Sequence, residues 1–448
     1  MSAPIPPNPT PTPRHKAIVE SFRESWPGLH KDARVEIFRR LTRLEAEDLF
    51  LSLAANDQAE IFHDMPESER RSWLRMLEPD DAADLIQQLP PDERDQAFKL
   101  LDVSARNEVS ALMAYEEDAA GGLMNPRFAR LRPEMRVDEA ISYLRAQAKS
   151  QVENLYTAYV LDSQQHLMGV VSFRDLFRAS PDKSVNEIME KQVMKIPDDM
   201  DQEEVSRHFS KHNLTIMPVV DKENKMKGVV TIDDIVGVVQ EEATEDIHKL
   251  GGMEVLEAPY LNIGFFKMIQ KRAGWLTILF LGEMLTAAAM GYYEKEIERA
   301  VVLALFIPLI ISSGGNSGSQ ATTLIIRSLA LGEVKLRDWW RVLRRELASG
   351  LTLGLILGAI GLMKIVFWPS SEKLYGEHYK MLGCAVGASL LGVVLWGTVV
   401  GSMLPFLLRR LGLDPASASA PFVATLVDVT GLVIYFSVAS LFLHGAMI

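Results

Sequence analysis

The stretch PFVATLVDVTGLVIYFSVASLFL, residues 421–443, decides the fold class because it is long and apolar enough to cross a bilayer. One carboxylate, Asp428, lies near its middle, with no basic residue nearby in the sequence. An ionised Asp at bilayer depth costs roughly 3 kcal/mol even on mild scales, and such residues usually face a bundle interior or a water-filled path. We therefore predict that Asp428 lines a cation or proton pathway. The alternative is a protonated or hydrogen-bonded Asp that only holds helices together.

The second half of the chain contains five such apolar segments, each long enough to cross the hydrocarbon core. They are Trp275–Tyr293, Val301–Ile326, Leu347–Trp368, Met381–Leu408 and Ala420–Leu443. We expect a multi-pass protein of the cell (inner) membrane.

Basic residues in the connecting loops set the expected orientation. They lie before the first span (Lys267, Lys271, Arg272), between the second and third (Arg327, Lys335, Arg337, Arg341, Arg344, Arg345) and after the fourth (Arg409, Arg410). The alternate loops are poor in Lys and Arg, so the positive-inside rule places the N-terminus in the cytoplasm and the C-terminus outside.

The second span is interrupted by the polar, glycine-rich run SSGGNSGSQ, residues 312–320. We predict a turn or kink at membrane depth that helps to line a pore through Asn316, since such backbone is tolerated only inside protein or beside water. Close helix packing through small residues is the alternative. Ala424 and Asp428 share a face of the last span. The role of Glu283, in the first span, stays open.

The first half of the chain is acidic and soluble in character. Residues 1–272 carry a net charge of −14, against +2 for residues 273–448. This charge argues against a nucleic-acid partner and favours either solvated carboxylate faces or divalent-cation sites. The single cysteine, Cys384, excludes an internal disulfide.

Residues 15–118 repeat short helical patterns separated by turn signals, so we predict helical hairpins stacked into an α-superhelix. Before them, residues 1–14 are rich in proline and are predicted to be a disordered tail.

An internal repeat follows. NLYTAYVLDSQQHLMGVVSFRDLF (154–177) aligns without gaps on NLTIMPVVDKENKMKGVVTIDDIV (213–236), and amphipathic helices, Val137–Ala148 and Gln202–His212, precede the two copies. Each copy predicts two strands and a helix, and the pair resembles a tandem of CBS domains over about residues 124–246. The resemblance implies an adenine nucleotide, with ATP as the expected ligand, held by a hydroxyl and a following Asp.

The positions that match are Ser172 with Asp175, and Thr231 with Asp234. Arg174 beside Asp175 could meet a phosphate, which makes the first copy the stronger candidate. The alternative for either hydroxyl is an ordinary helix N-cap.

Four signatures agree with this order of domains. They are YEEDAAGGLM (115–124), EEATEDIHKLGG (241–252), GGNSGSQATTLIIRSLALGE (314–333) and LPFLLRRLGLDPASASAPFVATLVDVTGLVIYF (404–436). Together they resemble the MgtE family of bacterial magnesium channels over about residues 15–448. The resemblance implies a homodimer with one pore on its twofold axis. It also implies a cytoplasmic part that binds Mg²⁺ and thereby holds a connecting helix over the pore.

The same resemblance assigns metal-binding roles to acidic residues. Asp428 matches the pore carboxylate and Asp414 an acidic position near the cytoplasmic mouth. The sensor positions are Asp48, Asp80, Asp84, Asp201, Glu203, Asp234, Glu242, Glu245 and Asp246. Without the family, each of these sensor residues would be read as a capping or solvated carboxylate.

Several positions depart from the family pattern. Ala420 stands where some relatives have a pore-lining Asn, so the second polar ring is either missing or supplied by Ser417 or Ser419. Gly237 and Asn213 replace acidic sensor positions, which should weaken some metal sites. Thr157 stands where an aromatic residue can stack on adenine, which should weaken ATP binding.

The resulting prediction is a multidomain chain: an α-helical superhelical N-terminal domain, α/β tandem CBS domains and an all-α five-span transmembrane domain. The expected boundaries are 15–123, 124–188 and 189–246 for the soluble domains, 247–266 for a connecting (plug) helix and 267–448 for the pore, lined by Asn316, Ala420, Ala424 and Asp428. We expect a passive Mg²⁺ channel closed by cytoplasmic Mg²⁺. The alternatives are a less selective channel for Co²⁺, Ni²⁺ or Mn²⁺ and a non-conducting nucleotide-sensing receptor. An enzyme is not expected, because no HExxH, GxSxG or Walker-type motif is present.

Overall fold

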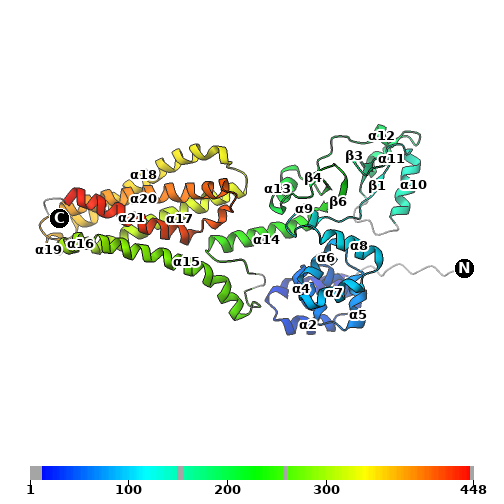
Figure 1. The fold of residues 1–448 in the computed structure, drawn as a ribbon, viewed down its shortest axis with the longest axis horizontal. Coiled ribbons are helices and arrows are strands. Elements are labelled where there is room, and N and C mark those ends of the chain that lie inside the picture. Colours follow the sequence, from blue (N-terminus) through cyan, green and yellow to red (C-terminus); the bar gives the residue numbers. More distant parts are fainter. Residues whose placement is uncertain (1–12, 149–155, 257–259, 444–448) are drawn as a thin grey trace. The chain divides into compact units, whose positions relative to one another are not determined.

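The computed structural model describes residues 13–148, 156–256 and 260–443. The chain divides into two compact units, which we treat separately: Met1–Glu242 with Ala258–Asn262, here the soluble unit, and Ala243–Glu257 with Ile263–Ile448, here the membrane unit (Figure 1). The predicted disordered tail falls almost wholly outside the described residues.

The soluble unit begins with short helices, as the sequence predicts (Figure 1). They are α1 (Pro13–Ser25), the 3₁₀ helix η1 (Trp26–Gly28), α2 (Lys31–Arg40), α3 (Arg43–Leu51), α4 (Ala55–His63), α5 (Glu67–Leu74), α6 (Pro79–Gln88), α7 (Pro91–Leu100) and α8 (Val103–Leu112). Local signals set their ends. Thr42 and Glu45 form a capping box on α3, and a proline occupies the first position of both α6 and α7.

Two copies of the predicted CBS unit follow a single helical turn, α9 (Ala120–Leu123). The first has β1 (Arg130–Leu131), α10 (Val137–Gln147), β2 (Thr157–Leu161), β3 (Leu167–Ser172) and α11 (Phe173–Arg178), and α12 (Val185–Ile188) follows it. The second has β4 (Ile196–Pro197), α13 (Gln202–His212), β5 (Ile216–Val220), β6 (Met226–Thr231) and α14 (Ile232–Leu250).

The two sheets repeat each other in detail. In both, the short first strand pairs in parallel with the second, which pairs antiparallel with the third. The register pairs Thr157 with Ser172 in one and Ile216 with Thr231 in the other, and both break register one residue before the end of the second strand. The gapless alignment of the repeat is thus confirmed.

Within residues 260–443, the membrane unit contains five helical segments long and apolar enough to cross a bilayer, as predicted. Its elements are α15 (Phe265–Tyr292), α16 (Glu294–Arg299), η2 (Val301–Phe306), α17 (Ile307–Ala330), η3 (Leu336–Asp338), α18 (Trp339–Phe367), α19 (Ser371–Tyr375), α20 (Tyr379–Arg410), η4 (Pro415–Ser417) and α21 (Ala420–Leu443). The buried core of this unit joins α17, α20 and α21, whereas most of α15 is exposed.

The predicted break in the second span is wrong. Residues 312–320 lie inside the continuous helix α17, and the irregular part is the 3₁₀ helix η2 that precedes it. Close packing is the reason, since a Cβ added at Gly397 would lie 2.4 Å from the carbonyl oxygen of Gly314. A Cβ added at Gly401 would lie 2.1 Å from the carbonyl oxygen of Gly318. Glycines on α17 and α20 therefore let two helix backbones touch, which was the alternative interpretation.

The predicted connecting helix over residues 247–266 is also wrong. Helix α14 begins at Ile232, directly after the last strand of the second CBS unit, and ends at Leu250. Gly252 follows with a φ of +68°, the left-handed conformation that often terminates a helix. Residues 251–264 are non-helical wherever the structure describes them.

Candidate functional site

Asp428 lies on α21, half-buried, on the side that faces α17. A Cβ added at Gly315 of α17 would be 3.4 Å from the Asp428 Oδ1 and 3.4 Å from the Cβ of Ala424. Two of the predicted pore-lining positions thus share one face, as their spacing predicts. Gly315 thus lies next to the carboxylate and places no side chain against it.

The other two predicted pore residues lie along the same pair of helices. Asn316 is exposed, and its Nδ2 donates to the Ser312 Oγ at 3.3 Å. The backbone carbonyl of Ala420 accepts a hydrogen bond of 3.1 Å from the Ser319 hydroxyl of α17. Position 420 therefore contributes a carbonyl, already hydrogen-bonded, and no polar side chain.

Ser419, one of the two residues that could supply the second polar ring, is not open to solvent. Its side chain is fully buried, and its hydroxyl accepts hydrogen bonds from the Trp275 Nε1 at 3.2 Å and from the Phe422 backbone at 3.3 Å. The serine is therefore part of the packing at the start of α21. Ser417 is half-buried in η4.

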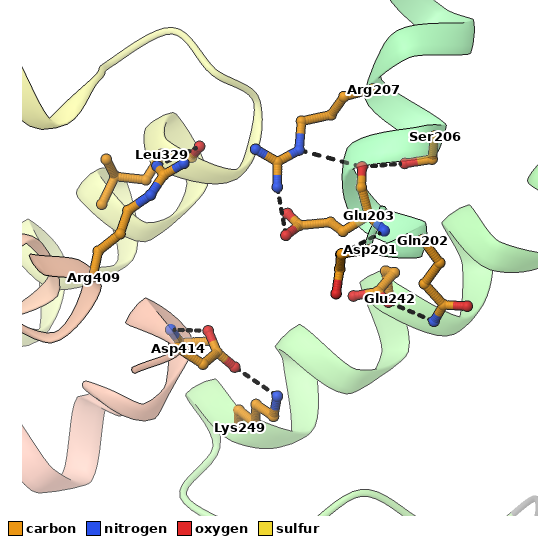
Figure 2. Close-up of polar contacts among 11 residues, drawn as sticks. Asp201, Gln202, Glu203, Ser206, Arg207, Glu242, Lys249, Leu329, Arg409 and Asp414 are labelled. Atoms are coloured by element: carbon orange, nitrogen blue, oxygen red, sulfur yellow. Dashed lines mark hydrogen bonds and ion pairs between the residues drawn. The ribbon is translucent and has the colours of Figure 1, made fainter. Parts of the chain in front are cut away.

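Asp414 caps η4 and also contacts the end of α14. Its Oδ1 accepts from the backbone N–H of Ala416 at 2.8 Å, and its Oδ2 accepts from the Lys249 ammonium at 2.6 Å (Figure 2). Lys249 also pairs with Glu245, one turn earlier on α14. Burial disfavours the charged lysine, but the hydrogen bonds to Asp414 and Glu245 outweigh it and raise the pKa of Lys249. The sequence-based assignment missed this lysine.

A second group of carboxylates gathers in the soluble unit, where α6 meets the beginning of α14. Burial, followed by the charges of Asp234, Glu78 and Asp233, raises the pKa of Asp81 to about 7, although its side chain keeps contact with solvent. Burial likewise raises the pKa of the half-buried Asp84 to about 7, reinforced by Asp81 and Glu117.

Burial also raises a pKa on α14, the other helix of this contact. Burial raises the pKa of Asp234 to about 6, although hydrogen bonding to Thr231 partly offsets it. We call Glu78, Asp81, Asp84, Glu117, Asp233, Asp234 and Glu241 the acidic cluster. It contains two predicted metal ligands, Asp84 and Asp234. The run of acids at positions 80, 81 and 84, one helical turn apart, could have pointed to Asp81 as well.

Asp80 and Asp48, two further predicted metal ligands, are not members of the acidic cluster. Asp80 is buried and accepts a hydrogen bond of 3.2 Å from Asn125, whose amide also donates to Glu78. Asp48 is half-buried on α3.

The remaining predicted sensor residues lie on α13 and α14. Asp201 caps α13 by accepting from the Glu203 N–H at 2.9 Å, and Glu203 pairs with Arg207 at 2.5 Å (Figure 2). Glu242 accepts a hydrogen bond of 2.7 Å from the Gln202 side chain. Asp246 is half-buried on α14. Among the described residues, no three His, Cys, Asp or Glu side chains are grouped closely enough to hold a metal ion.

The nucleotide candidates form a capped helix start. The Ser172 hydroxyl accepts from the Asp175 N–H at 3.1 Å and donates to the Asp175 carboxylate. Arg174 and Asp175 are exposed. The N-cap interpretation is confirmed for Ser172, and nucleotide binding stays a prediction.

The parts of the chain match known family models in the expected order. The model of the MgtE intracellular N domain matches residues 19–118, and the CBS domain model matches 120–182 and 185–241. The MgtE divalent cation transporter model matches residues 307–438. A "Magnesium transporter MgtE" of Thermus thermophilus is 45% identical over 346 residues, which cover 77% of this chain and 75% of the relative. The chain belongs to the MgtE family of magnesium transporters.

A second relative agrees with this assignment. An MgtE magnesium transporter of Enterococcus faecalis is 34% identical over 338 residues, or 75% of this chain and 72% of the relative. The chain is also similar, at 35% sequence identity, to the crystal structure of the cytosolic domain of the Mg²⁺ channel MgtE in complex with ATP. The match covers 50% of this chain and 93% of the chain in that structure, with a TM-score of 0.46. With its five apolar helices, this member of a transporter family is a multi-pass membrane protein.

Proposed function

We propose that this MgtE-family chain conducts Mg²⁺ down its electrochemical gradient into the cytoplasm, as a homodimer with an extracytoplasmic C-terminus. The position of Asp428 is the observation that carries the proposal. It is a half-buried carboxylate in the middle of an apolar helix, beside a glycine that places no side chain against it. The relatives that cover most of the chain are named magnesium transporters.

The chemistry of Mg²⁺ suits such a site. Mg²⁺ gives up its water reluctantly, so a wide ring of oxygens that grips the hydrated ion is cheaper than a cage that strips it. Two copies of Asp428 across a dimer axis would supply two carboxylates, and neighbouring backbone carbonyls would supply further acceptors.

We propose that the soluble unit senses Mg²⁺. The acidic cluster brings carboxylates of the N-terminal helices close to those of the second CBS unit. Burial and mutual repulsion raise the pKa values of Asp81, Asp84 and Asp234. Divalent ions would relieve that repulsion and hold the two faces together. Because α14 starts at the cluster and runs to Leu250, it is the element through which binding would act on the pore.

We also propose that the first CBS unit binds ATP. The Asp175 carboxylate would contact the ribose, and the Ser172 hydroxyl and the exposed Arg174 would face the phosphates. Thr157 provides no aromatic face for adenine, so the affinity should be low.

The second candidate function is a less selective divalent channel. Ala420 favours it, because this position provides no side-chain oxygen to reinforce Asp428. Selectivity among Mg²⁺, Co²⁺, Ni²⁺ and Mn²⁺ would then rest more heavily on Asp428.

Flux into liposomes that contain the purified full-length protein tests both candidates. Mg²⁺ uptake should be abolished by Asp428→Asn, which keeps the shape and removes the charge, and by Asp428→Ala. Glu346→Gln, which neutralises a half-buried carboxylate on α18, is the control and should conduct. Undiminished flux in Asp428→Asn with an intact dimer would overturn the proposal, and Co²⁺ or Ni²⁺ passing as readily as Mg²⁺ would favour the second candidate.

A further inference from the structure

The C-terminal end of α14 belongs to the membrane unit and contacts the rest of that unit through an ion pair and apolar packing. The Lys249 ammonium donates to the Asp414 Oδ2 at 2.6 Å, and these two residues lie 165 positions apart in the sequence. Next to it, Leu250 packs against the buried group formed by Ile326, Ala416 and Ala418. An ionic contact and an apolar contact therefore fix the last turn of the helix together.

The turn after α14 adds a contact that depends on shape. Gly252 has a φ of +68°, and a Cβ added to it would lie 2.7 Å from the Trp275 indole of α15. That indole donates a hydrogen bond of 3.2 Å to Ser419, just before α21. Farther on, the backbone N–H of Glu254 donates a hydrogen bond of 3.1 Å to the carbonyl oxygen of Lys271 on α15. The chain thus stays on the membrane unit for several residues beyond Lys249.

Lys249 occupies the position in which a cation would join Glu245 and Asp414. Its ammonium contacts both carboxylates at once, and each side chain is about two-thirds buried, with exposed fractions of 29% for Lys249, 30% for Glu245 and 36% for Asp414. A divalent ion that used the same oxygens would have to displace the ammonium. The second Asp414 oxygen is already used by the backbone of Ala416.

We infer that Lys249 is the resident cation of the Glu245–Asp414 pair and holds the end of α14 on the membrane unit without Mg²⁺. The family resemblance assigns both carboxylates to metal binding, and the inference gives this pair a different occupant. It rests on the proposed function, because it concerns the regulation of the same channel. Its consequence is that removal of Mg²⁺ releases the carboxylates of the acidic cluster but leaves this attachment in place.

Hydrogen–deuterium exchange of the full-length protein in detergent tests the inference without depending on conduction. In the wild type, the amides of residues 245–253 should be protected equally in EDTA and in millimolar Mg²⁺. Lys249→Met keeps the apolar stem and removes the charge. It should exchange about fivefold faster in EDTA, as expected for the loss of a partly exposed ion pair. Lys249→Arg, the control, should keep the protection.

The effect of Mg²⁺ on the variants separates a resident cation from simple packing. In Lys249→Met, Mg²⁺ should restore protection, because the freed carboxylates can now take a divalent ion. In Lys249→Met combined with Asp414→Asn, Mg²⁺ should restore nothing, while the cap on η4 is kept by the Asn oxygen. Wild-type protection that disappears in EDTA, or a Lys249→Met variant as protected as the wild type, would overturn the inference. A failure of the proposed conduction would instead appear only in the liposome assay.

Discussion

Neutralising Asp84 should stabilise the soluble unit when divalent ions are absent. Asp84 lies on α6, half-buried, among the carboxylates of the acidic cluster. In Asp84→Asn the side chain keeps its size and loses its charge. The variant should therefore relieve repulsion between α6 and the beginning of α14 without opening a cavity.

The size of the effect follows from the pKa of Asp84, which burial and the neighbouring charges raise from 3.8 to about 7. Each unit corresponds to about 1.4 kcal/mol, so ionised Asp84 destabilises the folded state by at most about 4 kcal/mol at pH 8. Contact with solvent and relaxation of the cluster reduce this, and we expect a gain of about 2 kcal/mol for Asp84→Asn. For a unit of this size, that gain corresponds to a rise in Tm of about 4–8 °C.

The sign of the pH dependence is fixed by the same shift. Because the folded pKa lies above the unfolded one, the folded state binds more protons between about pH 4 and pH 7. The stability of the wild type should fall as the pH rises through that window and be lowest above it. The advantage of Asp84→Asn should therefore be largest at pH 8 and disappear near pH 4.

Thermal unfolding of the full-length protein in detergent, with EDTA or with millimolar Mg²⁺, measures these differences. Mg²⁺ should raise the Tm of the wild type at pH 8 more than that of Asp84→Asn, because a divalent ion has less repulsion to relieve in the variant. Asp95→Asn, on the exposed face of α7, is the matched control and should change neither value. Equal stability of Asp84→Asn and the wild type in EDTA at pH 8 would refute the electrostatic account of the cluster.

Two further predictions concern packing. Arg34 is 2% exposed and pairs with Asp57 at 2.6 Å, so Arg34→Met should destabilise the N-terminal helices by about 3 kcal/mol, measured by denaturant unfolding, because it leaves a largely buried carboxylate unpaired. Unchanged stability would contradict that assignment. Gly401→Ala should lower the Tm of the protein in detergent by several degrees, since its Cβ would meet the carbonyl oxygen of Gly318 and cost about 2 kcal/mol or more. Gly291→Ala, with open space around the new methyl group, should be neutral, and equal Tm values for the two alanine variants would argue against close contact of α17 and α20.

The sequence predicted best those elements whose pattern is both long and periodic. The bounds of α13 and α21 agree with the expected Gln202–His212 and Ala420–Leu443, because an amphipathic face and an uninterrupted apolar run are each set within one segment. The glycines of α17 were misjudged because intrinsic propensity disfavours them in a helix. Their contacts with α20, about eighty positions away, decide the matter and are invisible locally.

The end of α14 differs from the prediction for the opposite reason, because the signal that ends this helix is local. Gly251 and Gly252 directly follow Leu250, and a glycine in the left-handed conformation is a common helix terminator. A prediction that gave this pair its ordinary weight would have ended the helix at the observed residue.

The candidate site was predictable only where a residue's own surroundings in the sequence identify it. Asp428 is conspicuous because a carboxylate is rare in an apolar span. Lys249 is inconspicuous, because its partner Asp414 lies far away in the sequence and an isolated lysine near a helix C-terminus is commonplace. Resemblance to a family transfers the carboxylates of a metal site but not the ammonium that lies between two of them.

The two acidic sites of this chain therefore compensate negative charge in different ways. In the acidic cluster, neighbouring carboxylates raise the pKa values of Asp81, Asp84 and Asp234, and the charge of Arg127 acts on Glu78. Protons or divalent ions should therefore provide most of the compensation at the three aspartates, and the cluster should respond to their concentration. At Asp414, the compensating charge is covalently attached to α14 and cannot be diluted or chelated. A chelator should accordingly loosen the first site and spare the second. If it loosened both equally, an ion and not Lys249 would have to be the cation that joins Glu245 to Asp414.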